Sequence, residues 1–439
     1  MKHIQILVDN KYRDLYPAIL LKLYIKNNTN KVRVILANKK NQHALYKAFC
    51  PEIVVLPHCF GYMNYHINYM KKRSVITVMP TAGSNISEMY VLQRYVQNTD
   101  EQNFKVIKRI FLWGEKVKDI FLRTGKYNES QLLVTGTPRL DIFRIIGQNK
   151  KELGKYIGFG PSIRHLTSIF DSNLITLINN YSRVYNKETK SILWKKGGQY
   201  ADWIWYETAF LEALTAIIKN ISELGNSIKM VIRPHPFESE KIYRDWVDSK
   251  KYSVDVIKNE PLWNFYSRLN LFVQAYSTTS VEAIYCCIPV ISMKYLIGDR
   301  VKDHIPSEVY NGFIEDYLWK PKGIQEFIDL VEKAKKGQLA VSPKPEDLAK
   351  KLQELYNYDS DKLATQLIGN DLIKLIDLDT TKRKATNFYK LSKFLLFECY
   401  LLFKGYKKKD YNYSPIRIND IISSYEIKKA YKRYFNYIA

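Results

Sequence analysis

The sequence predicts an α/β protein with two doubly wound, Rossmann-like halves that face a cleft, followed by a helical, basic C-terminal tail. Short apolar runs alternate with stretches of helical spacing through residues 1–147, and this rhythm resumes after residue 228. The chain has 439 residues, of which 46% are hydrophobic, so it is too long for one ordinary domain and can bury two cores. A run rich in lysine and aromatic residues closes the chain.

The first half contains six candidate strands, and the second half contains four more. Each is a short apolar run followed by a helical segment, which predicts parallel sheets with helices on both faces. The first six are "IQILV" (4–8), "VRVILA" (32–37), "IVVLP" (53–57), "VITVM" (75–79), "IFLW" (110–113) and "LLVTG" (132–136). The other four are "KMVIRP" (229–234), "VDVIK" (254–258), "LFVQAY" (271–276) and "PVISM" (289–293).

These patterns divide the chain into a Rossmann-like domain at 1–150, a second one at 151–380 and a basic amphipathic tail at 381–439. The stretch "NKKELGKYIGFGPSIRHL" predicts a linker that leads into a strand, and a long amphipathic helix is predicted from about Trp203. In such folds the ligands bind in the crevice outside the carboxyl ends of the strands, so the functional residues are sought there.

The charge balance favours an anionic partner. The chain has 68 Lys and Arg against 44 Asp and Glu, a net charge of +24, which suits nucleic acid, anionic lipid, a nucleotide-linked donor or an acidic glycan. Its five cysteines have neither the number nor the spacing of a disulfide framework or a zinc site, so a reducing cytoplasm is expected. The N-terminus does not resemble a signal peptide, and no apolar run is long enough to span a bilayer.

The strand at 229–232 runs directly into Arg233, Pro234, His235 and Pro236. Two prolines restrict the backbone around His235 and hold its imidazole in one direction, as contact with a phosphate or a leaving oxygen requires. This tip is predicted to lie at the carboxyl end of its strand and to point into the cleft. The alternative is a structural turn whose histidine caps a helix.

A second candidate is the strand-to-helix turn in "AYSTTSVEAIY" (275–285). Hydroxyl groups and free backbone N–H groups at the start of a helix form an anion site, here at Ser277, Thr278, Thr279 and Ser280. Glu282, inside the predicted helix, is positioned to accept hydrogen bonds from ribose hydroxyls. Ordinary N-capping by Thr279 or Ser280 is the alternative. This turn and the His235 tip are expected on neighbouring strands of one sheet.

The pair of motifs resembles nucleotide-sugar transferases of the GT-B type, above all those that use cytidine nucleotides. The segments "ILVDNKYRDL" (6–15), "FLWGEKVKDIF" (111–121) and "VTGTPRLDIF" (134–143) look like the bacterial surface-carbohydrate biosynthesis family, which includes the retaining Kdo transferases of capsule and O-antigen assembly. The resemblance covers residues 4–300. It implies that His235, Ser277, Thr278 and Thr279 are donor-site residues, and Arg233, Ser280 and Glu282 of the same two motifs are also expected to bind the donor.

The resemblance also implies a carboxylate nucleophile upstream of the His-Pro strand. Retention of configuration requires two displacements through a covalent intermediate. Asp202, which follows a Gly-Gly loop, is the candidate, and N-capping of the helix after it is the alternative. An acid/base residue is expected from the first half, where Glu88 is the first choice. Stabilisation of a helix N-terminus by Glu88 is the alternative.

The loop after the first strand is expected to bind an anionic acceptor through Lys11 and Arg13, next to Asp9 and Asp14. In "GTPRLD" (136–141), Arg139 and Asp141 are positioned to pair across a strand-to-helix turn, so that a structural role and ligand contact remain open.

The tail at 381–439 holds 14 Lys and Arg against 4 Asp and Glu. Its segment "KLSKFLLFECYLLFKGYKKKDY" combines an apolar band with flanking lysines, which is typical of an interfacial helix on anionic lipid. No nucleic-acid partner is expected, because the aromatic sheet motifs of RNA-binding modules are missing. No metal or other cofactor is expected, since the acidic "DLD" at 377–379 lies far in sequence from the other motifs.

Together these observations predict an enzyme: a glycosyltransferase at the inner face of the bacterial inner membrane that moves a Kdo-like sugar from a CMP-linked donor to a surface polysaccharide or lipid-linked glycan. Two alternatives stay open. One is a CDP-glycerol or CDP-ribitol polyol-phosphate transferase, and the other is a non-catalytic basic protein that binds membrane or nucleic acid.

Overall fold

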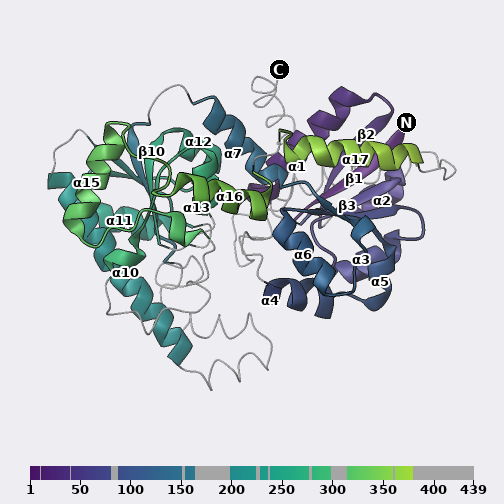
Figure 1. Cartoon of the computed structure of the whole chain (residues 1–439), viewed down its shortest axis with the longest axis horizontal. Coiled ribbons are helices and arrows are strands. Elements are labelled where there is room, and N and C mark those ends of the chain that lie inside the picture. The colour runs from purple at the N-terminus through teal and green to yellow at the C-terminus, as the bar shows by residue number, and fades with distance from the viewer. Residues whose placement is uncertain are drawn as a thin grey trace, which may run out of the picture. The chain divides into compact units, whose positions relative to one another are not determined.

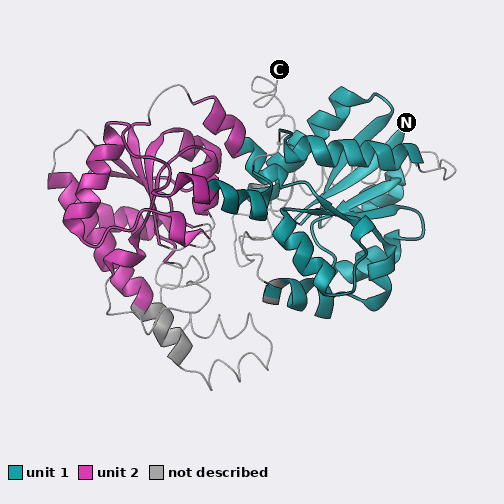
Figure 2. Ribbon diagram, in the orientation of Figure 1, with its two compact units in different colours: residues 1–142, 349–439 teal, residues 143–348 magenta. Residues whose placement is uncertain are grey.

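The computed structural model describes residues 1–9, 11–39, 41–80, 88–150, 154–163, 198–223, 228–235, 238–275, 279–297, 314–358 and 361–378. The chain forms two compact units (Figure 2). The first is Met1–Ile142 with the chain from Ala349 onward, and the second is Phe143–Leu348. This division differs from the sequence-based one at 151–380, because residues after 348 return to the first unit.

A parallel sheet of six strands forms the first unit, in the order β2-β1-β3-β4-β5-β6 (Figure 1). The strands are short, and those from β1 to β4 are almost wholly buried, as expected for a sheet with helices on both faces. The strands are β1 (Lys2–Val8), β2 (Val32–Asn38), β3 (Ile53–Leu56), β4 (Val75–Val78), β5 (Ile107–Leu112) and β6 (Leu132–Val134).

Alternate side chains of these strands enter two different cores, since the side-chain period of a strand is two residues. Leu7 belongs to the cluster formed with α2, α3, α5 and α6, whereas Ile4 and Ile6 are buried on the other face. The helices of this unit are α1 (Lys11–Asn28), α2 (Gln42–Phe49), α3 (Met63–Met70), α4 (Glu88–Val91), α5 (Glu101–Val106), α6 (Glu115–Arg123), α7 (Pro138–Gln148, shared with the second unit), α17 (Ala364–Leu378) and the short turns η1 (Leu92–Gln97) and η2 (Glu129–Gln131).

Helix α17 packs against α1, which explains why the end of the described chain belongs to the first unit. The carboxylate of Asp141 caps α17: it accepts hydrogen bonds from the backbone N–H of Ala364 (3.0 Å) and of Thr365 (2.7 Å) and from the Thr365 hydroxyl (2.6 Å). Arg109 also pairs with Asp371 of this helix at 3.0 Å. The aspartate of "GTPRLD" therefore has a structural role.

The second unit holds a parallel sheet of five strands in the order β11-β10-β7-β8-β9. The strands are β7 (Tyr156–Gly160), β8 (Lys229–Ile232), β9 (Val254–Val256), β10 (Leu269–Gln274) and β11 (Val290–Ser292). The helices and turns are α10 (Gly198–Glu223), α11 (Glu240–Lys250), α12 (Leu262–Ser267), α13 (Thr279–Tyr285), η3 (Met293–Leu296), η5 (Glu315–Tyr317), α15 (Ile324–Lys335) and α16 (Pro345–Tyr356, shared with the first unit).

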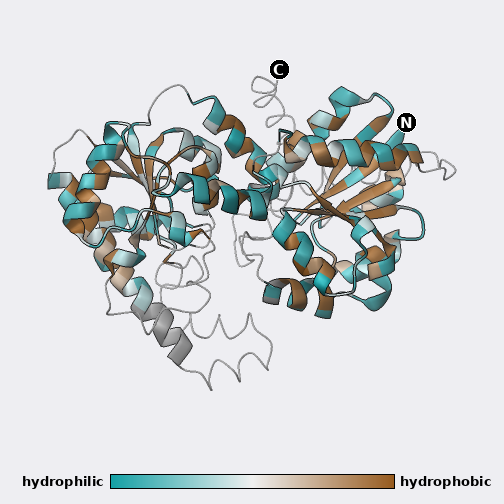
Figure 3. Ribbon diagram, viewed as in Figure 1, coloured by the Kyte–Doolittle hydropathy of each residue, from teal (hydrophilic) through white to brown (hydrophobic). Residues whose placement is uncertain are grey.

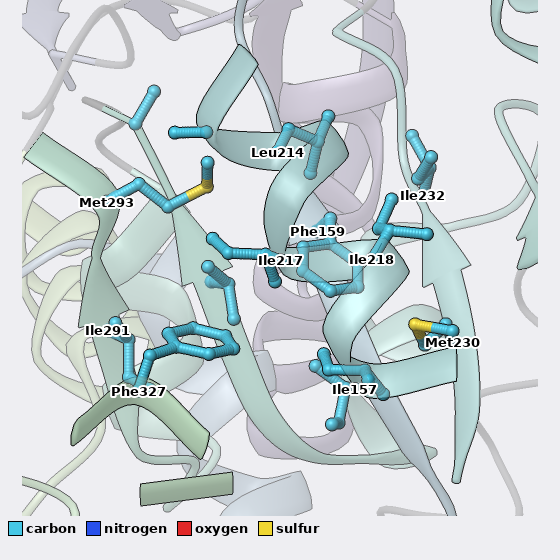
Figure 4. Close-up of a cluster of buried hydrophobic side chains, with 14 of the residues drawn as sticks. Ile157, Phe159, Leu214, Ile217, Ile218, Met230, Ile232, Ile291, Met293 and Phe327 are labelled. Atoms are coloured by element: carbon cyan, nitrogen blue, oxygen red, sulfur yellow. The ribbon is translucent and has the colours of Figure 1, made fainter. Parts of the chain in front are cut away.

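One face of the second sheet is closed by α10, α11 and α15. Figure 4 shows Leu214, Ile217 and Ile218 of α10 against Phe159 and Ile157 of β7. On the other face the aromatic rings of α12 and β10 lie close to the backbone of β7, because a Cβ on Gly158 would meet the Leu269 side chain at 2.4 Å and one on Gly160 would meet the Phe272 ring at 2.7 Å. Only glycine fits at both positions.

The observed fold confirms the predicted α/β architecture with two doubly wound, Rossmann-like sheets. Every strand expected from the apolar runs is present, with ends that differ by a few residues, and the strand expected near residue 156 is β7. Figure 3 shows the strands as mainly hydrophobic segments between helices of mixed hydropathy. The tail at 381–439 lies outside the described residues.

Candidate functional site

The carboxyl ends of β10, β7 and β8 form the edge of the second sheet to which the sequence assigned the donor site. The prediction that the Ser/Thr turn and the His235 tip follow neighbouring strands is wrong, because β7 lies between β10 and β8. Strand β7 opens the unit at its centre, and the chain then builds β8 and β9 on one side and β10 and β11 on the other. The strand order therefore reverses between β7 and β10, which is the position where such sheets bind ligands.

Arg233 directly follows β8, and its backbone N–H extends the sheet by donating to the Phe159 carbonyl (2.8 Å). The guanidinium does not project freely. Its Nη2 donates to the carbonyl of Glu260 (2.8 Å), and it lies 5.5 Å from the centre of the Phe265 ring. Its Nη1 is buried and has no hydrogen-bond partner among the described residues. Burial lowers the pKa of the guanidinium, against the opposing effect of Tyr266, Glu260 and Glu282, but an arginine remains charged.

The backbone of His235 is fixed by Glu238. Glu238 Oε2 accepts a hydrogen bond from the His235 N–H (2.6 Å), and the Glu238 N–H donates to the His235 carbonyl (2.9 Å). The Glu238 side chain is fully buried. A closed turn with a buried carboxylate therefore holds the tip in place, a role that the sequence reasoning assigned to the prolines; Pro236 lies outside the described residues.

The pKa of the Glu238 carboxyl is shifted by its buried surroundings. Burial raises the pKa of Glu238 to about 7, helped by the charge of Glu207 on α10 and opposed by hydrogen bonds from the His235 and Ile163 backbones and the Tyr243 side chain. Lys258, beyond β9, donates to the Glu238 carbonyl (2.5 Å). Perturbed acids of this kind concentrate at functional sites, although structural networks also produce them. Sequence reasoning missed Glu238; the signal was an acidic residue three positions after the histidine.

The Ser/Thr turn is described only from Thr279, since Ser277 and Thr278 lie outside the described residues. The Thr279 carbonyl accepts a hydrogen bond from the Tyr266 hydroxyl (2.8 Å), and Ser280 is buried in the first turn of α13. Glu282 is only 2% exposed, and its charge acts on Arg233 and Tyr266. The Glu282 carboxyl thus faces the interior near Arg233, where it compensates positive charge.

The loop after β7 is a further part of this edge that sequence reasoning did not select. Ser162 adopts a left-handed conformation with φ of 56°, which is uncommon for a serine. The loop that holds Ser162 follows β7, which lies between β10 and β8, the strands that precede the two predicted loops. The signal in the sequence was "GFGPS", in which both glycines are required by the rings above them. Such backbone strain is often kept at ligand sites.

Asp202 lies within α10, which begins at Gly198, so that it does not occupy the N-cap position that the alternative interpretation gave it. The helix starts earlier than the sequence indicated, since it already includes Gly198. The Asp202 side chain is outside the described part of the chain. Its proposed role as the nucleophile remains a prediction.

In the first unit, the charged residues after β1 bind one another. Lys11, Arg13 and Asp14 belong to α1 and not to a loop, since the helix begins at Lys11. The Arg13 guanidinium donates to both Asp14 oxygens, at 2.5 and 2.7 Å, and lies 3.5 Å from Asp9. Lys39 pairs with Asp9 at 2.7 Å. Burial raises the pKa of Asp9, but these cations outweigh it and hold the pKa below its usual value. The Lys11 side chain is not among those described.

Glu88 is the first residue of α4, and its side chain is 53% exposed and pairs with Arg123 at 3.3 Å. A carboxylate in the first turn stabilises a helix through the dipole, so the alternative interpretation of Glu88 fits its position. Its catalytic role remains a prediction.

His58 is a second residue that the sequence reasoning missed. It follows β3 at the carboxyl edge of the first sheet, is 7% exposed, and stacks on Phe60 with ring centres 4.2 Å apart. Burial lowers the pKa of His58 to about 4, against the attraction of Asp9, so the imidazole is neutral near pH 7. The sequence feature that could have pointed to His58 is its place directly after the apolar run at 53–57, which ends in a proline.

Within the described ranges no three His, Cys, Asp or Glu side chains are grouped so as to hold a metal ion. The acidic "DLD" segment is described up to Leu378, and Asp377 lies at the end of α17. None of the helices in the described part of the chain combines the length and the apolar character needed to cross a membrane.

No protein-family model matches the chain, and no curated protein matches it either. A crystal structure of UDP-N-acetylglucosamine 2-epimerase matches 88% of this chain and 99% of its own, with a TM-score of 0.50 and 11% identity. The UDP-GlcNAc 2-epimerase of Neisseria meningitidis, bound to UDP-GlcNAc, matches 85% and 100%, with a TM-score of 0.49 and 12% identity. The wall teichoic acid polymerase TagF matches 87% and 90%, with a TM-score of 0.49 and 14% identity. At these identities the likeness shows the GT-B-type fold alone.

Proposed function

We propose that the protein is a glycosyltransferase that moves a Kdo-like ulosonic acid from a CMP-linked donor to a surface polysaccharide or lipid-linked glycan. The second unit binds the donor and the first unit binds the acceptor. No metal ion takes part in this proposal. The fold supports it, because the epimerase that matches with a TM-score of 0.50 acts, by its name, on a nucleotide sugar. The RPHP and Ser/Thr motifs resemble those of transferases that use cytidine nucleotides, and for this reason we propose CMP as the nucleotide of the donor.

One observation carries the proposal: a half-buried guanidinium, with one nitrogen fully covered, follows the second sheet at its carboxyl edge, next to a histidine turn held by a carboxylate. Arg233 has a buried Nη1 without a partner among the described residues, and the His235 backbone is held by Glu238. Leaving such a donor unpaired costs free energy, whereas a phosphate oxygen would satisfy it through a charge-assisted hydrogen bond. His235 would stabilise the leaving phosphate, and the Ser/Thr turn from Ser277 to Ser280 would bind it through hydroxyl and N–H groups.

The reaction is a double displacement. The carboxylate of Asp202 attacks the anomeric carbon, the bond from that carbon to the phosphate oxygen breaks, and CMP leaves with the bonding electrons. An acceptor hydroxyl then attacks the same carbon from the opposite side and releases the Asp202 carboxylate. Glu88 accepts the proton of this hydroxyl. Lys11 and Arg13 hold the anionic acceptor through their charges.

Calorimetry with CMP, CDP, UMP and RNA tests the donor. CMP should bind most tightly, and His235→Ala should weaken CMP binding at least tenfold, while His66→Asn in the first unit should leave it unchanged. RNA binding without CMP binding would contradict the proposal. A polyol-phosphate transferase also releases CMP, so CDP-glycerol is titrated as well. Tighter binding of CDP-glycerol than of CMP would favour that alternative, and no nucleotide binding at all would favour a non-catalytic basic protein.

We further propose that the tail holds the enzyme at the cytoplasmic face of the inner membrane. A basic segment gains about 1 kcal/mol per Lys or Arg near anionic lipid, and salt weakens this attraction. Truncation after Asp379 should release the protein from phosphatidylglycerol vesicles and leave CMP binding intact. If the truncated chain still sediments with these vesicles at moderate salt, or if the full chain never does, the tail serves another partner.

A further inference from the structure

A row of tyrosines lies exposed on one helix of the first unit. Tyr62, Tyr65 and Tyr69 are 44%, 67% and 37% exposed, although the other face of α3 is buried through Met63, Ile67 and Met70. Residues three and four positions apart share a helix face, so the three rings line one side of α3. Large exposed aromatic groups in a row point to an interaction surface.

Helix α2 contributes to the same surface. His43 lies between the rings, with ring centres 4.9 Å from Tyr69, 5.9 Å from Tyr65 and 4.6 Å from His66. The ammonium of Lys47 lies 5.9 Å from the centre of the Tyr69 ring. We call this set the α3 aromatic surface, and it comprises Tyr62, Tyr65, His66 and Tyr69 together with His43 and Lys47.

The surface is uncharged in the middle and has a lysine at each end, of which Lys39 is paired with the Asp9 carboxylate (2.7 Å). Burial lowers the pKa of His66 to about 4 and also lowers that of His43, so both imidazoles are neutral near pH 7. Lys47 marks one end, and the ammonium of Lys39 lies 4.9 Å from the Tyr62 ring at the other. The large exposed side chains are all tyrosines, without the Leu, Phe or Trp that anchor a protein in lipid. Tyrosine instead offers a rigid apolar face with a hydrogen-bonding edge.

The Tyr62 end of the surface adjoins the carboxyl edge of the first sheet. The Tyr62 hydroxyl donates to Asp9 (3.2 Å), and Asp9 pairs with Lys39 (2.7 Å) and follows β1 directly. The acceptor site proposed above lies at this edge, beside Arg13. From there the surface runs along α3 to Tyr69, so that a long acceptor would reach it.

We propose that the α3 aromatic surface binds the acceptor chain away from its reacting end, as a row of sugar rings that carry carboxylate groups. The apolar faces of the sugar rings stack on Tyr65 and Tyr69, and a carboxylate pairs with Lys47. This inference rests on the proposed function, because it assumes that the substrate is an anionic glycan.

The test uses an oligomer of sialic acid, a chain of acidic sugars with one carboxylate per ring, titrated into the full-length protein. Tyr65→Ser should weaken its binding about tenfold, as the loss of one aromatic contact predicts, and Tyr65→Ser with Tyr69→Ser should weaken it further. Lys47→Gln should weaken it and reduce its dependence on salt. Tyr295→Ser is the matched control, since Tyr295 is also 37% exposed with a lysine, Lys320, 4.9 Å from its ring, but lies in the second unit.

CMP titrations of the same variants separate this inference from the proposed function. Unchanged CMP affinity and melting temperature with weaker oligosaccharide binding support the surface. Equal oligosaccharide binding by wild type and the double variant overturns it, as does a wild type that binds CMP but not the oligosaccharide. If the variants lose binding to phosphatidylglycerol vesicles and keep oligosaccharide binding, the surface contacts lipid and the inference is wrong.

Discussion

The carboxyl edges of the two sheets use their charges in opposite ways. At the edge of the second sheet, Glu238 and Glu282 are buried, and Arg233 is half-buried with its Nη1 fully covered. At the edge of the first sheet, Arg13 and Lys39 are partly exposed and are shared among neighbouring carboxylates. Both edges arise from the same sheet architecture, so the difference lies in how far each group has been removed from water.

That difference indicates that the two edges suit different kinds of ligand. Buried charges are costly unless a partner satisfies them, so the second edge suits one small, charged ligand in a fixed position. Exposed, mutually paired charges bind weakly and tolerate different geometries, which suits a long and variable ligand. The four experiments below test this contrast, from the largest expected effect to the smallest.

Asp202→Asn should lower turnover by about a thousandfold or more, because an amide cannot act as the nucleophile of a double displacement. CMP affinity should stay within a few-fold of wild type. Intact-mass spectrometry of the wild type with donor alone should detect a glycosyl adduct on the peptide of α10. Asp245→Asn, a change at an exposed ion pair on α11, serves as the control. Undiminished turnover in the Asp202 variant would rule out this nucleophile.

Arg233→Gln and Arg13→Gln compare the two edges directly. Arg233→Gln removes the charged hydrogen bond to the Glu260 carbonyl and the contact with the Phe265 ring, so it should reduce the free energy of unfolding by about 2–4 kcal/mol and abolish CMP binding. Arg13 is partly exposed but pairs with the buried carboxylate of Asp14, so its loss should cost about 1–2 kcal/mol and leave CMP binding unchanged. Urea titrations and calorimetry measure both. Equal losses in the two variants would remove the contrast between the edges.

The parts of the fold that sequence alone predicted are those with a strong apolar period. Residues 53–56 are four apolar side chains and residues 271–274 include three, and the shortness of these runs favours strands over helices. The order of strands was not predictable in the same way. Whether β7 separates β8 from β10 depends on crossover connections, which leave no local pattern in the sequence.

The sequence indicated the loops of the candidate site but not the buried residues that hold them in place. The RPHP tip was visible because prolines and charge directly follow an apolar run. Glu238 and His58 were not, because their significance depends on burial, and a single acid or histidine in a sequence carries no signal of the atoms that will cover it. Glu282 was predicted to accept hydrogen bonds from ribose hydroxyls, whereas tertiary packing buries its carboxyl, whose charge acts on Arg233.

His58→Asn should change the acid stability of the first unit. The pKa of His58 is lowered to about 4, so between pH 6.5 and 4 the unfolded chain binds the proton that the folded chain does not, and stability falls as the pH falls. From pH 7 to pH 5 this amounts to about 2 kcal/mol for a shift of this size. Urea titrations with proteolysis followed peptide by peptide report the unit separately. In the variant, the free energy of unfolding should no longer show this part of the pH dependence. If it falls with pH as steeply as in the wild type, His58 is not a buried, neutral imidazole.

Glu238→Gln should have the smallest effect and the opposite sign. The pKa of Glu238 is raised to about 7, so its contribution to stability is fully present below pH 4.5 and is lost as the pH rises through 7. Between pH 6 and 8 the free energy of unfolding of the second unit should fall by about 1 kcal/mol.

CMP affinity should fall a few-fold over the same interval, since an ionised Glu238 beside the His235 turn repels the phosphate. Glutamine keeps an oxygen to accept the His235 N–H but cannot ionise, so the variant should hold CMP nearly equally at both pH values. The phosphate of CMP titrates in the same way in both proteins, and the difference between their profiles therefore isolates Glu238. Asp245→Asn should keep the wild-type profile. If the Gln variant keeps it too, the buried carboxylate does not tune the donor site, and the contrast between the two edges rests on Arg233 alone.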